Sequence, residues 1–105
     1  MKHYKIVILP GDGIGPEITA SAIEILKEVS KHSDINFDFI EKVIGGKSID
    51  LHDVPITDDT LEACLSSDSI FLGAVGGPKW DNVEHDNKPE QALLKLRKSL
   101  GLYSN

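Results

Sequence analysis

The sequence predicts an α/β fold, part of a layered domain built on a mostly parallel sheet. Two near-continuous apolar runs, over residues 4–9 and 69–75, are typical of strands buried on both faces. A third segment, residues 35–40, alternates apolar and polar side chains as a half-exposed strand does. Helical patterns separate these segments, and strands that alternate with helices favour parallel pairing.

The strand over residues 4–9 is closed by Pro10 and Gly11, and a helix is predicted over residues 16–31. Pro16 suits the first helical position, and Glu17 complements the positive end of the helix dipole. The apolar residues of this helix are expected on one face: Ile18, Ala22, Ile25, Leu26 and Val29.

After residues 35–40, Gly45 and Gly46 break the chain, and Thr57 can cap a short helix. The residues expected to point inward from that helix are Leu61, Cys64 and Leu65. The strand over residues 69–75 and a polar loop over residues 76–88 follow. A last helix is predicted to open at Pro89 and to carry Leu93, Leu94, Leu96 and Leu100.

Composition excludes several classes of protein. The chain has 17 acidic and 11 basic residues, a formal charge of -6 and no long basic cluster, which disfavours nucleic acid and anionic membranes as partners. Its one cysteine, Cys64, lies in an apolar helical pattern and is interpreted as a buried thiol in a reducing compartment. No stretch approaches the roughly 20 apolar residues of a spanning helix. The chain start does not read as a secretory signal, so we expect a cytoplasmic protein.

No metal-binding spacing is present in the sequence. The histidines are scattered and are interpreted as surface residues: His3, His32, His52 and His85.

The first candidate functional segment is the glycine loop Pro10-Gly11-Asp12-Gly13-Ile14-Gly15-Pro16-Glu17, between a buried strand and a helix start. Backbone N–H groups at such a place can bind an anion. A dinucleotide-binding G-x-G-x-x-G reading fails, however, because Pro16 stands at the last glycine position and lacks an N–H. Asp12 would also set a negative charge beside a pyrophosphate. The loop alone is equally consistent with a ligand loop and with a structural turn.

The second candidate segment is Gly73-Ala74-Val75-Gly76-Gly77-Pro78-Lys79-Trp80-Asp81, which leaves the carboxyl end of a predicted strand. Ligands of open α/β sheets gather at carboxyl ends of strands, and adjacent glycines allow close approach of a flat cofactor. The alternative is a surface turn with a solvated lysine. The placement of the chain's single tryptophan beside two glycines favours the functional interpretation.

Together these segments resemble the isocitrate and isopropylmalate dehydrogenase family, whose members open with a strand followed by Leu9-Pro10-Gly11-Asp12-Gly13-Ile14-Gly15-Pro16-Glu17. The segments over residues 73–80 and Pro89-Glu90-Gln91-Ala92-Leu93-Leu94-Lys95-Leu96-Arg97-Lys98 are similar to the isopropylmalate branch. The resemblance covers residues 4–105. It implies that this chain is the amino-terminal segment of the first, cofactor-side domain, with the second domain and the remainder of the first outside it.

The resemblance also implies a reaction, the NAD-dependent oxidative decarboxylation of (2R,3S)-3-isopropylmalate to 4-methyl-2-oxopentanoate and CO2 in leucine biosynthesis. It implies Mg or Mn as metal and a homodimer. The residues that it places at NAD are Ile14, Gly77, Pro78, Lys79, Trp80, Asp81, Asn82 and Glu90. Those that it places at the substrate are Arg97, Leu93, Leu94 and Glu90. The family's catalytic tyrosine and lysine and its metal-binding aspartates have no counterpart in this chain.

Each residue role that the resemblance implies has a simpler structural alternative. Arg97 could merely complement a helix dipole, Glu90 could do the same at the opposite end, and a leucine stripe is ordinarily core. The alternative activities within the same superfamily are those of dehydrogenases acting on tartrate, D-malate or homoisocitrate, against which Leu93 and Leu94 argue. The remaining alternative is a catalytically inert remnant. We expect the chain by itself to be marginally stable or prone to aggregation, and without dehydrogenase activity.

Overall fold

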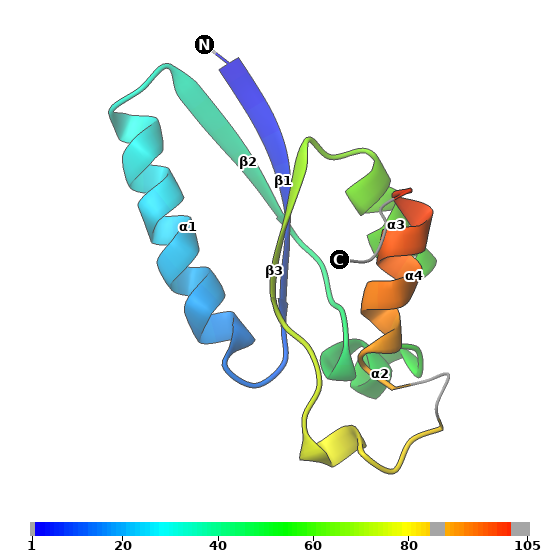
Figure 1. Cartoon of the computed structure of the whole chain (residues 1–105). Helices are drawn as coiled ribbons and strands as arrows, with labels where there is room; N and C mark the ends of the chain where they lie inside the picture. Colours follow the sequence, from blue (N-terminus) through cyan, green and yellow to red (C-terminus); the bar gives the residue numbers. More distant parts are fainter. Residues whose placement is uncertain (1, 85–87, 102–105) are drawn as a thin grey trace.

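A computed structural model describes residues 2–84 and 88–101 and contains a three-stranded parallel sheet with helices on both faces (Figure 1). The strands are β1 (Lys2–Gly11), β2 (Ile35–Glu41) and β3 (Ser69–Ala74), in the order β2-β1-β3. Ile6 of the central strand pairs with Phe39 on one side and with Ser69 on the other. The predicted α/β class and parallel sheet are therefore confirmed.

Helix α1 (Gly15–Lys31) packs along one face of the sheet, and α3 (Asp58–Leu65) and α4 (Gln91–Ser99) lie on the opposite face (Figure 1). The core on the α3 and α4 side is formed by buried residues from the sheet, the helices and the loops between them: Val7, Leu9, Ile44, Ile56, Leu61, Cys64, Ala92 and Leu96. Because side chains alternate along a strand, Ile6 and Ile8 of β1 point to the other face and are buried there.

Short helical segments lie in the chain between β2 and α4. The helix α2 (Gly46–His52) follows β2 and was not predicted, since seven residues with little apolar periodicity give no clear signal. Thr57 caps α3 as predicted, its hydroxyl accepting a hydrogen bond from the Thr60 backbone N–H at 3.2 Å. The 3-10 turn η1 (Pro78–Trp80) lies within the predicted polar loop over residues 76–88.

Two predicted faces need correction. On α1, Ala22 and Leu26 are partly buried as predicted, whereas Ile18, Ile25 and Val29 are between 45% and 66% exposed, so only part of the predicted face contacts the protein. Thr19 is buried in their place, because the sheet-facing stripe of α1 begins with small residues. On α3, Leu65 was predicted to point inward but is 57% exposed, since the helix buries Leu61 and Cys64 and then ends.

The last helix begins two residues later than predicted: Pro89 and Glu90 form the turn before α4. None of the helices in the described residues is long and apolar enough to cross a membrane.

Candidate functional site at the strand ends

The candidate site lies where the three parallel strands end. From the central strand β1 the chain passes through α1 to β2 on one side, and later returns to β3 on the other side. Such a reversal of connection direction leaves a crevice beside the carboxyl ends of the strands, where ligands of open α/β sheets bind. Both candidate segments of the sequence, residues 10–17 and 73–81, meet at this point, as the backbone hydrogen bond from Asp12 N to Ala74 O at 2.7 Å shows.

Asp12 follows β1 directly and binds the segments that come after β2 and β3. Its carboxylate is buried, with 4% of the residue exposed, and accepts three backbone hydrogen bonds. Gly46 N and Gly76 N donate to Oδ2 at 2.7 and 2.8 Å, and Lys47 N donates to Oδ1 at 2.9 Å. The sequence analysis placed the charge of Asp12 beside any bound pyrophosphate, as an argument against such a ligand. In the structure the carboxylate points into the protein, where backbone N–H groups bind it.

The loop after β3 requires glycine where it passes Asp12. Gly76 has φ of 99°, and a β-carbon added there would lie 2.8 Å from Glu90 Oε1. Gly45, before α2, has φ of 72°, and its added β-carbon would lie 2.6 Å from Asp12 Oδ2. Side chains at these two positions would therefore be strained by the backbone and would also displace carboxylates.

Helix α2 holds the η1 turn through Asp50. Lys79 Nζ donates to Asp50 Oδ2 at 2.7 Å, and Trp80 Nε1 donates to Asp50 Oδ1 at 3.2 Å. The Lys79 ammonium also lies 5.5 Å from the Trp80 ring centroid. The hydrogen bonds from Lys79 and then Trp80 lower the pKa of the Asp50 carboxyl from its ordinary value. Lys79 and Trp80 were predicted to contact the cofactor, and here they are tied to α2.

Beneath the Trp80 indole lies Gly46, the first residue of α2. A β-carbon on Gly46 would overlap the indole ring carbons, so the contact between α2 and η1 requires glycine. Sequence reasoning missed Asp50 and this role of Gly46. Nothing in the local sequence around either residue marks a partner about thirty positions later in the chain, so no sequence signal could have revealed them.

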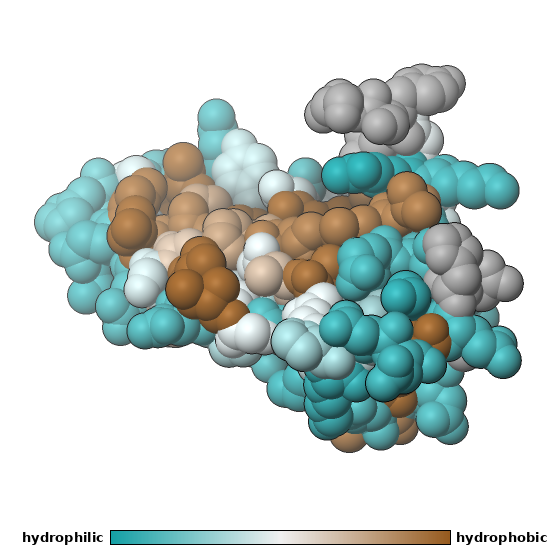
Figure 2. Space-filling model, turned by 60° about the horizontal axis from the view of Figure 1, so that its bottom comes forward, coloured by the Kyte–Doolittle hydropathy of each residue, from teal (hydrophilic) through white to brown (hydrophobic). Residues whose placement is uncertain are grey.

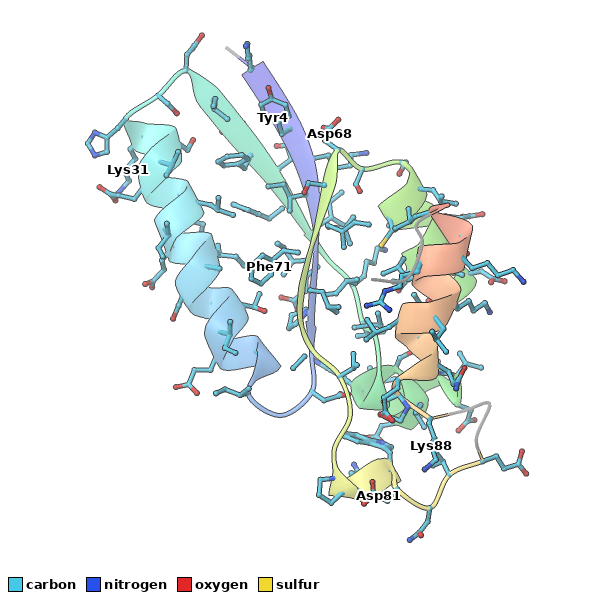
Figure 3. All side chains as sticks on the ribbon, viewed as in Figure 1. Tyr4, Lys31, Asp68, Phe71, Asp81 and Lys88 are labelled. Atoms are coloured by element: carbon cyan, nitrogen blue, oxygen red, sulfur yellow. The ribbon has the colours of Figure 1, made fainter. Side chains whose placement is uncertain are left out.

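The other predicted cofactor residues line the open side of the same loops. Ile14 is 59% exposed at the start of α1. Glu90 is exposed, and its carboxylate lies beside Gly76. Gly77 is partly buried before η1. The remaining predicted residues of this loop, Pro78, Asp81 and Asn82, are exposed. Figure 3 shows Asp81 and Lys88 in this part of the molecule, at the end remote from Tyr4 and Lys31.

Helix α4 brings the predicted substrate residues onto one face. Glu90, Leu93, Leu94 and Arg97 follow the i, i+3, i+4, i+7 spacing that places side chains on the same side of a helix. The core-facing side of α4 is different, since it carries the buried Ala92. Arg97 is exposed, Leu93 is partly buried and Leu94 is 55% exposed.

Leu94 also borders a shallow pocket of about 350 Å³ between α4 and the segment after α2. Its lining residues are Val54, Pro55, Ile56, Gln91, Leu94, Lys95 and Lys98. Because Glu90 and Arg97 do not line this pocket, the predicted substrate face of α4 lies beside it. Leu94 is at the boundary of the two surfaces.

No group of three or more histidine, cysteine or acidic side chains that could hold a metal occurs in the described part of the chain. His3, His32 and His52 are exposed, as predicted, whereas His85 lies outside the described residues. Cys64 is buried as predicted, and its burial raises the pKa of the thiol.

Comparison with known proteins identifies the family. A family model described as isocitrate/isopropylmalate dehydrogenase matches residues 5–105. The chain belongs to this family. The 3-isopropylmalate dehydrogenase of Chlorobaculum tepidum is 54% identical over 102 residues, which is 97% of this chain and 29% of that protein. The 3-isopropylmalate dehydrogenase of Aquifex aeolicus is 50% identical over 105 residues, again 29% of its length. The chain thus spans less than a third of these curated relatives.

Solved structures support the same fold within the isocitrate/isopropylmalate dehydrogenase family. A β-decarboxylating dehydrogenase from Thermococcus kodakarensis matches with a TM-score of 0.72 and 33% identity, over 95% of this chain and 27% of that one. Isocitrate dehydrogenase from Methylococcus capsulatus matches with a TM-score of 0.77 over 95% of this chain and 26% of its own. At 24% identity, the second likeness concerns the fold alone.

Proposed function

We propose that the chain is the amino-terminal segment of a 3-isopropylmalate dehydrogenase, which oxidises and decarboxylates 3-isopropylmalate with NAD as hydride acceptor. The observation that carries this proposal is the shared face of α4, where Glu90, Leu93, Leu94 and Arg97 lie in helical register beside the loop after β3. Such a face combines a cation for a carboxylate with apolar surface for an alkyl group. Relatives named 3-isopropylmalate dehydrogenase, at 50–54% identity, support the choice of substrate.

Arg97 is assigned to the malate part of the substrate. Its guanidinium is exposed in the last turn of α4, and a planar fork of N–H donors matches a carboxylate in bidentate geometry. Leu93 and Leu94, on the same face, would receive the isopropyl group. A purely structural Arg97 would only complement the helix dipole, which lysine would do equally well.

The strand-end loops fit a nicotinamide cofactor. A β-carbon added to Gly13 would meet no described atom within 4 Å, so the turn beside the exposed Ile14 is open. Glu90 provides an acceptor on the other side of the loops. We assign NAD to this surface, with Ile14, Glu90 and residues 77–82 around it. When bound, NAD would accept the hydride.

Mg or Mn would polarise the carbonyl formed by oxidation, as a Lewis acid. The described residues do not supply a ligand cluster for it, so its ligands are assigned to another part of the enzyme. The proposal extends to leucine biosynthesis, to a cytoplasmic homodimer, and to the placement of this chain in the cofactor-side domain.

A chimera tests the proposed function. Residues 1–105 would replace the aligned segment of the Chlorobaculum tepidum enzyme, and NAD reduction would be measured with 3-isopropylmalate, isocitrate, D-malate and tartrate. We expect turnover that is highest with 3-isopropylmalate. Arg97→Lys should lower kcat/KM by roughly tenfold or more, because a bidentate contact is lost, whereas the exposed neighbour variant Lys95→Gln should leave it unchanged.

The other outcomes identify the alternatives. A chimera that folds as the parent enzyme does but turns over none of these substrates would mark the chain as an inert remnant. Preference for D-malate or tartrate would assign it to a related dehydrogenase. Equal activity of Arg97→Lys and the unmodified chimera would remove Arg97 from the substrate site.

A further inference from the structure

The Asp12 carboxylate is an internal anion for helix α2. Gly46 and Lys47 are the first two residues of that helix, and their N–H groups both donate to Asp12. Helix N-termini attract anions because their first N–H groups have no partner within the helix. The anion at this terminus is a side chain of the protein, delivered from the end of β1.

The same carboxylate fixes the loop after β3. Gly76 N donates to Asp12 Oδ2 at 2.8 Å, so one oxygen is shared between the loop and α2. Hydrogen bonds to an ionised acceptor are about twice as strong as neutral ones. Because the site is buried, neither loop can exchange this partner for water without exposing the carboxylate.

Gly76 in turn lies against the proposed cofactor surface, since its α-carbon position faces the Glu90 carboxylate. Helix α2, held at its first residues by Asp12, carries the Asp50 that binds Lys79 and Trp80. Both routes from Asp12 therefore end at residues assigned to NAD, although Asp12 is itself buried beneath them.

We propose that Asp12 is the positioning residue of the cofactor surface: it sets the Gly76 loop and α2 in register with the end of β1, and so places Glu90 and η1. This inference rests on the proposed function. It also assigns the glycine loop over residues 10–17 a different task from a pyrophosphate loop, because its acidic side chain receives amides from its neighbours.

The test uses Asp12→Asn in the chimera described above. Asparagine has nearly the same shape, but its amide nitrogen would face backbone N–H donors, so at least one of the three hydrogen bonds is lost. We expect kcat/KM for NAD to fall by about tenfold or more, mainly through a higher KM for NAD, because a small misplacement of binding groups costs that much or more.

Thr57→Ala is the matched control, because it removes the cap of α3 and leaves all three hydrogen bonds to Asp12 in place. It should lower the urea midpoint while leaving KM for NAD unchanged. A second readout needs no turnover. In the isotopically labelled chimera, the amide resonances of Gly46, Lys47 and Gly76 should shift, and their hydrogen exchange should accelerate, in Asp12→Asn only.

An inactive unmodified chimera would contradict the proposed function. The inference on Asp12 is tested by different results. It is overturned if the chimera is active and Asp12→Asn keeps the parent KM for NAD, or if the three amides exchange as in Thr57→Ala. Should Asp12→Asn not fold, Asp12→Glu retains the charge and displaces it by one methylene. The same rise in KM is then expected, and an unchanged KM overturns the proposal.

Discussion

Replacement of Gly46 by alanine tests the contact between α2 and η1 directly. Gly46 is buried under Trp80, and a β-carbon there overlaps ring carbons Cδ2, Cε2 and Cζ2 of the indole. The backbone cannot retreat, because the Gly46 N–H is bonded to the buried Asp12 carboxylate at 2.7 Å. The indole must therefore move.

The expected cost follows from two opposing effects. Overpacking a closed contact typically costs about 1–3 kcal/mol. Alanine recovers up to about 1 kcal/mol over glycine in a helix interior, and less at Gly46 because it is the first residue of α2. We expect Gly46→Ala to lower the free energy of unfolding by about 1–2 kcal/mol. Displacement of the indole also breaks the 3.2 Å hydrogen bond between Trp80 Nε1 and Asp50.

Trp80 makes the assay specific, because it is the only tryptophan of the chain. In Gly46→Ala its fluorescence should shift to longer wavelength, its indole N–H resonance should move, and the urea midpoint should fall. Ser48→Ala is the control in the same helix. Its buried hydroxyl has no hydrogen-bond partner among the described residues, so its removal should be neutral or stabilising. Unchanged Trp80 signals in Gly46→Ala would refute the packing argument.

Four further measurements follow from the structure. Lys79→Met should return the pKa of Asp50 toward 3.8 in an NMR titration. The pKa of Asp50 is lower in the folded chain than in the unfolded one. The ionised Asp50 therefore stabilises the fold at pH above its unfolded pKa, and this stabilisation is lost as pH falls through its folded pKa. The Cys64 thiol, with its pKa raised by burial from 9.0, should react with a disulfide reagent several-fold more slowly in the folded chain than in urea. The neutral thiol stabilises the fold fully below the pKa of Cys64 in the unfolded chain, and this contribution is lost as pH rises through its pKa in the folded chain. Equal reaction rates of Cys64 in the folded and unfolded states would contradict its burial. Leu96→Ala should cost about 2–5 kcal/mol in urea unfolding because the residue is 6% exposed, and a cost below that of an exposed Leu94→Ala would contradict the assigned core. Sedimentation of the chain by itself should show self-association, and a stable monomer would contradict that expectation. Dehydrogenase turnover by the chain alone would contradict its expected inactivity.

The expected self-association has its origin in two surfaces. Strands β2 and β3 form open edges of the described sheet, because each pairs only with β1. On α1, exposed apolar residues recur at Ile18, Ile25 and Val29. Figure 2 shows apolar surface on the left of the molecule, the side on which α1 lies, and a further band of it across the middle. Contiguous apolar surface of this kind favours association between copies.

The three strands and the helices α1, α3 and α4 could be predicted because each has its own local pattern of apolar residues. Helix α2 could not, since the anion that satisfies its first N–H groups, Asp12, stands 34 and 35 positions earlier. The contact face of α1 was misassigned for a related reason. Its apolar residues form a broad stripe, and the choice of the buried part depends on how closely Thr19 and Gly15 approach Gly73 on β3.

The candidate site shows the same division. The sequence could predict that residues 10–17 and 73–81 each leave the end of a strand, as the structure confirms for β1 and β3. It could not predict that Lys79 and Trp80 bind Asp50, since that pairing spans 29 and 30 positions and joins two solvent-facing segments. Residues on one helix are easier to group: the shared face of Glu90, Leu93 and Arg97 follows from spacing alone.

The inward orientation of Asp12 explains why the glycine loop departs from a dinucleotide-binding pattern. Such a pattern presents N–H groups at a helix start to a phosphate, and a proline in the first helical turn removes one donor. In this chain Pro16 stands there, and the nearby carboxylate receives the N–H groups of α2 and of the loop after β3. A loop arranged in this way frames the strand ends and offers little to discriminate between substrates. Under the proposed function, discrimination within the described residues is expected from α4, whose exposed face pairs Arg97 with Leu93 and Leu94. Substitutions on that face should then change the preferred substrate, whereas substitutions of Asp12 should change the affinity for NAD.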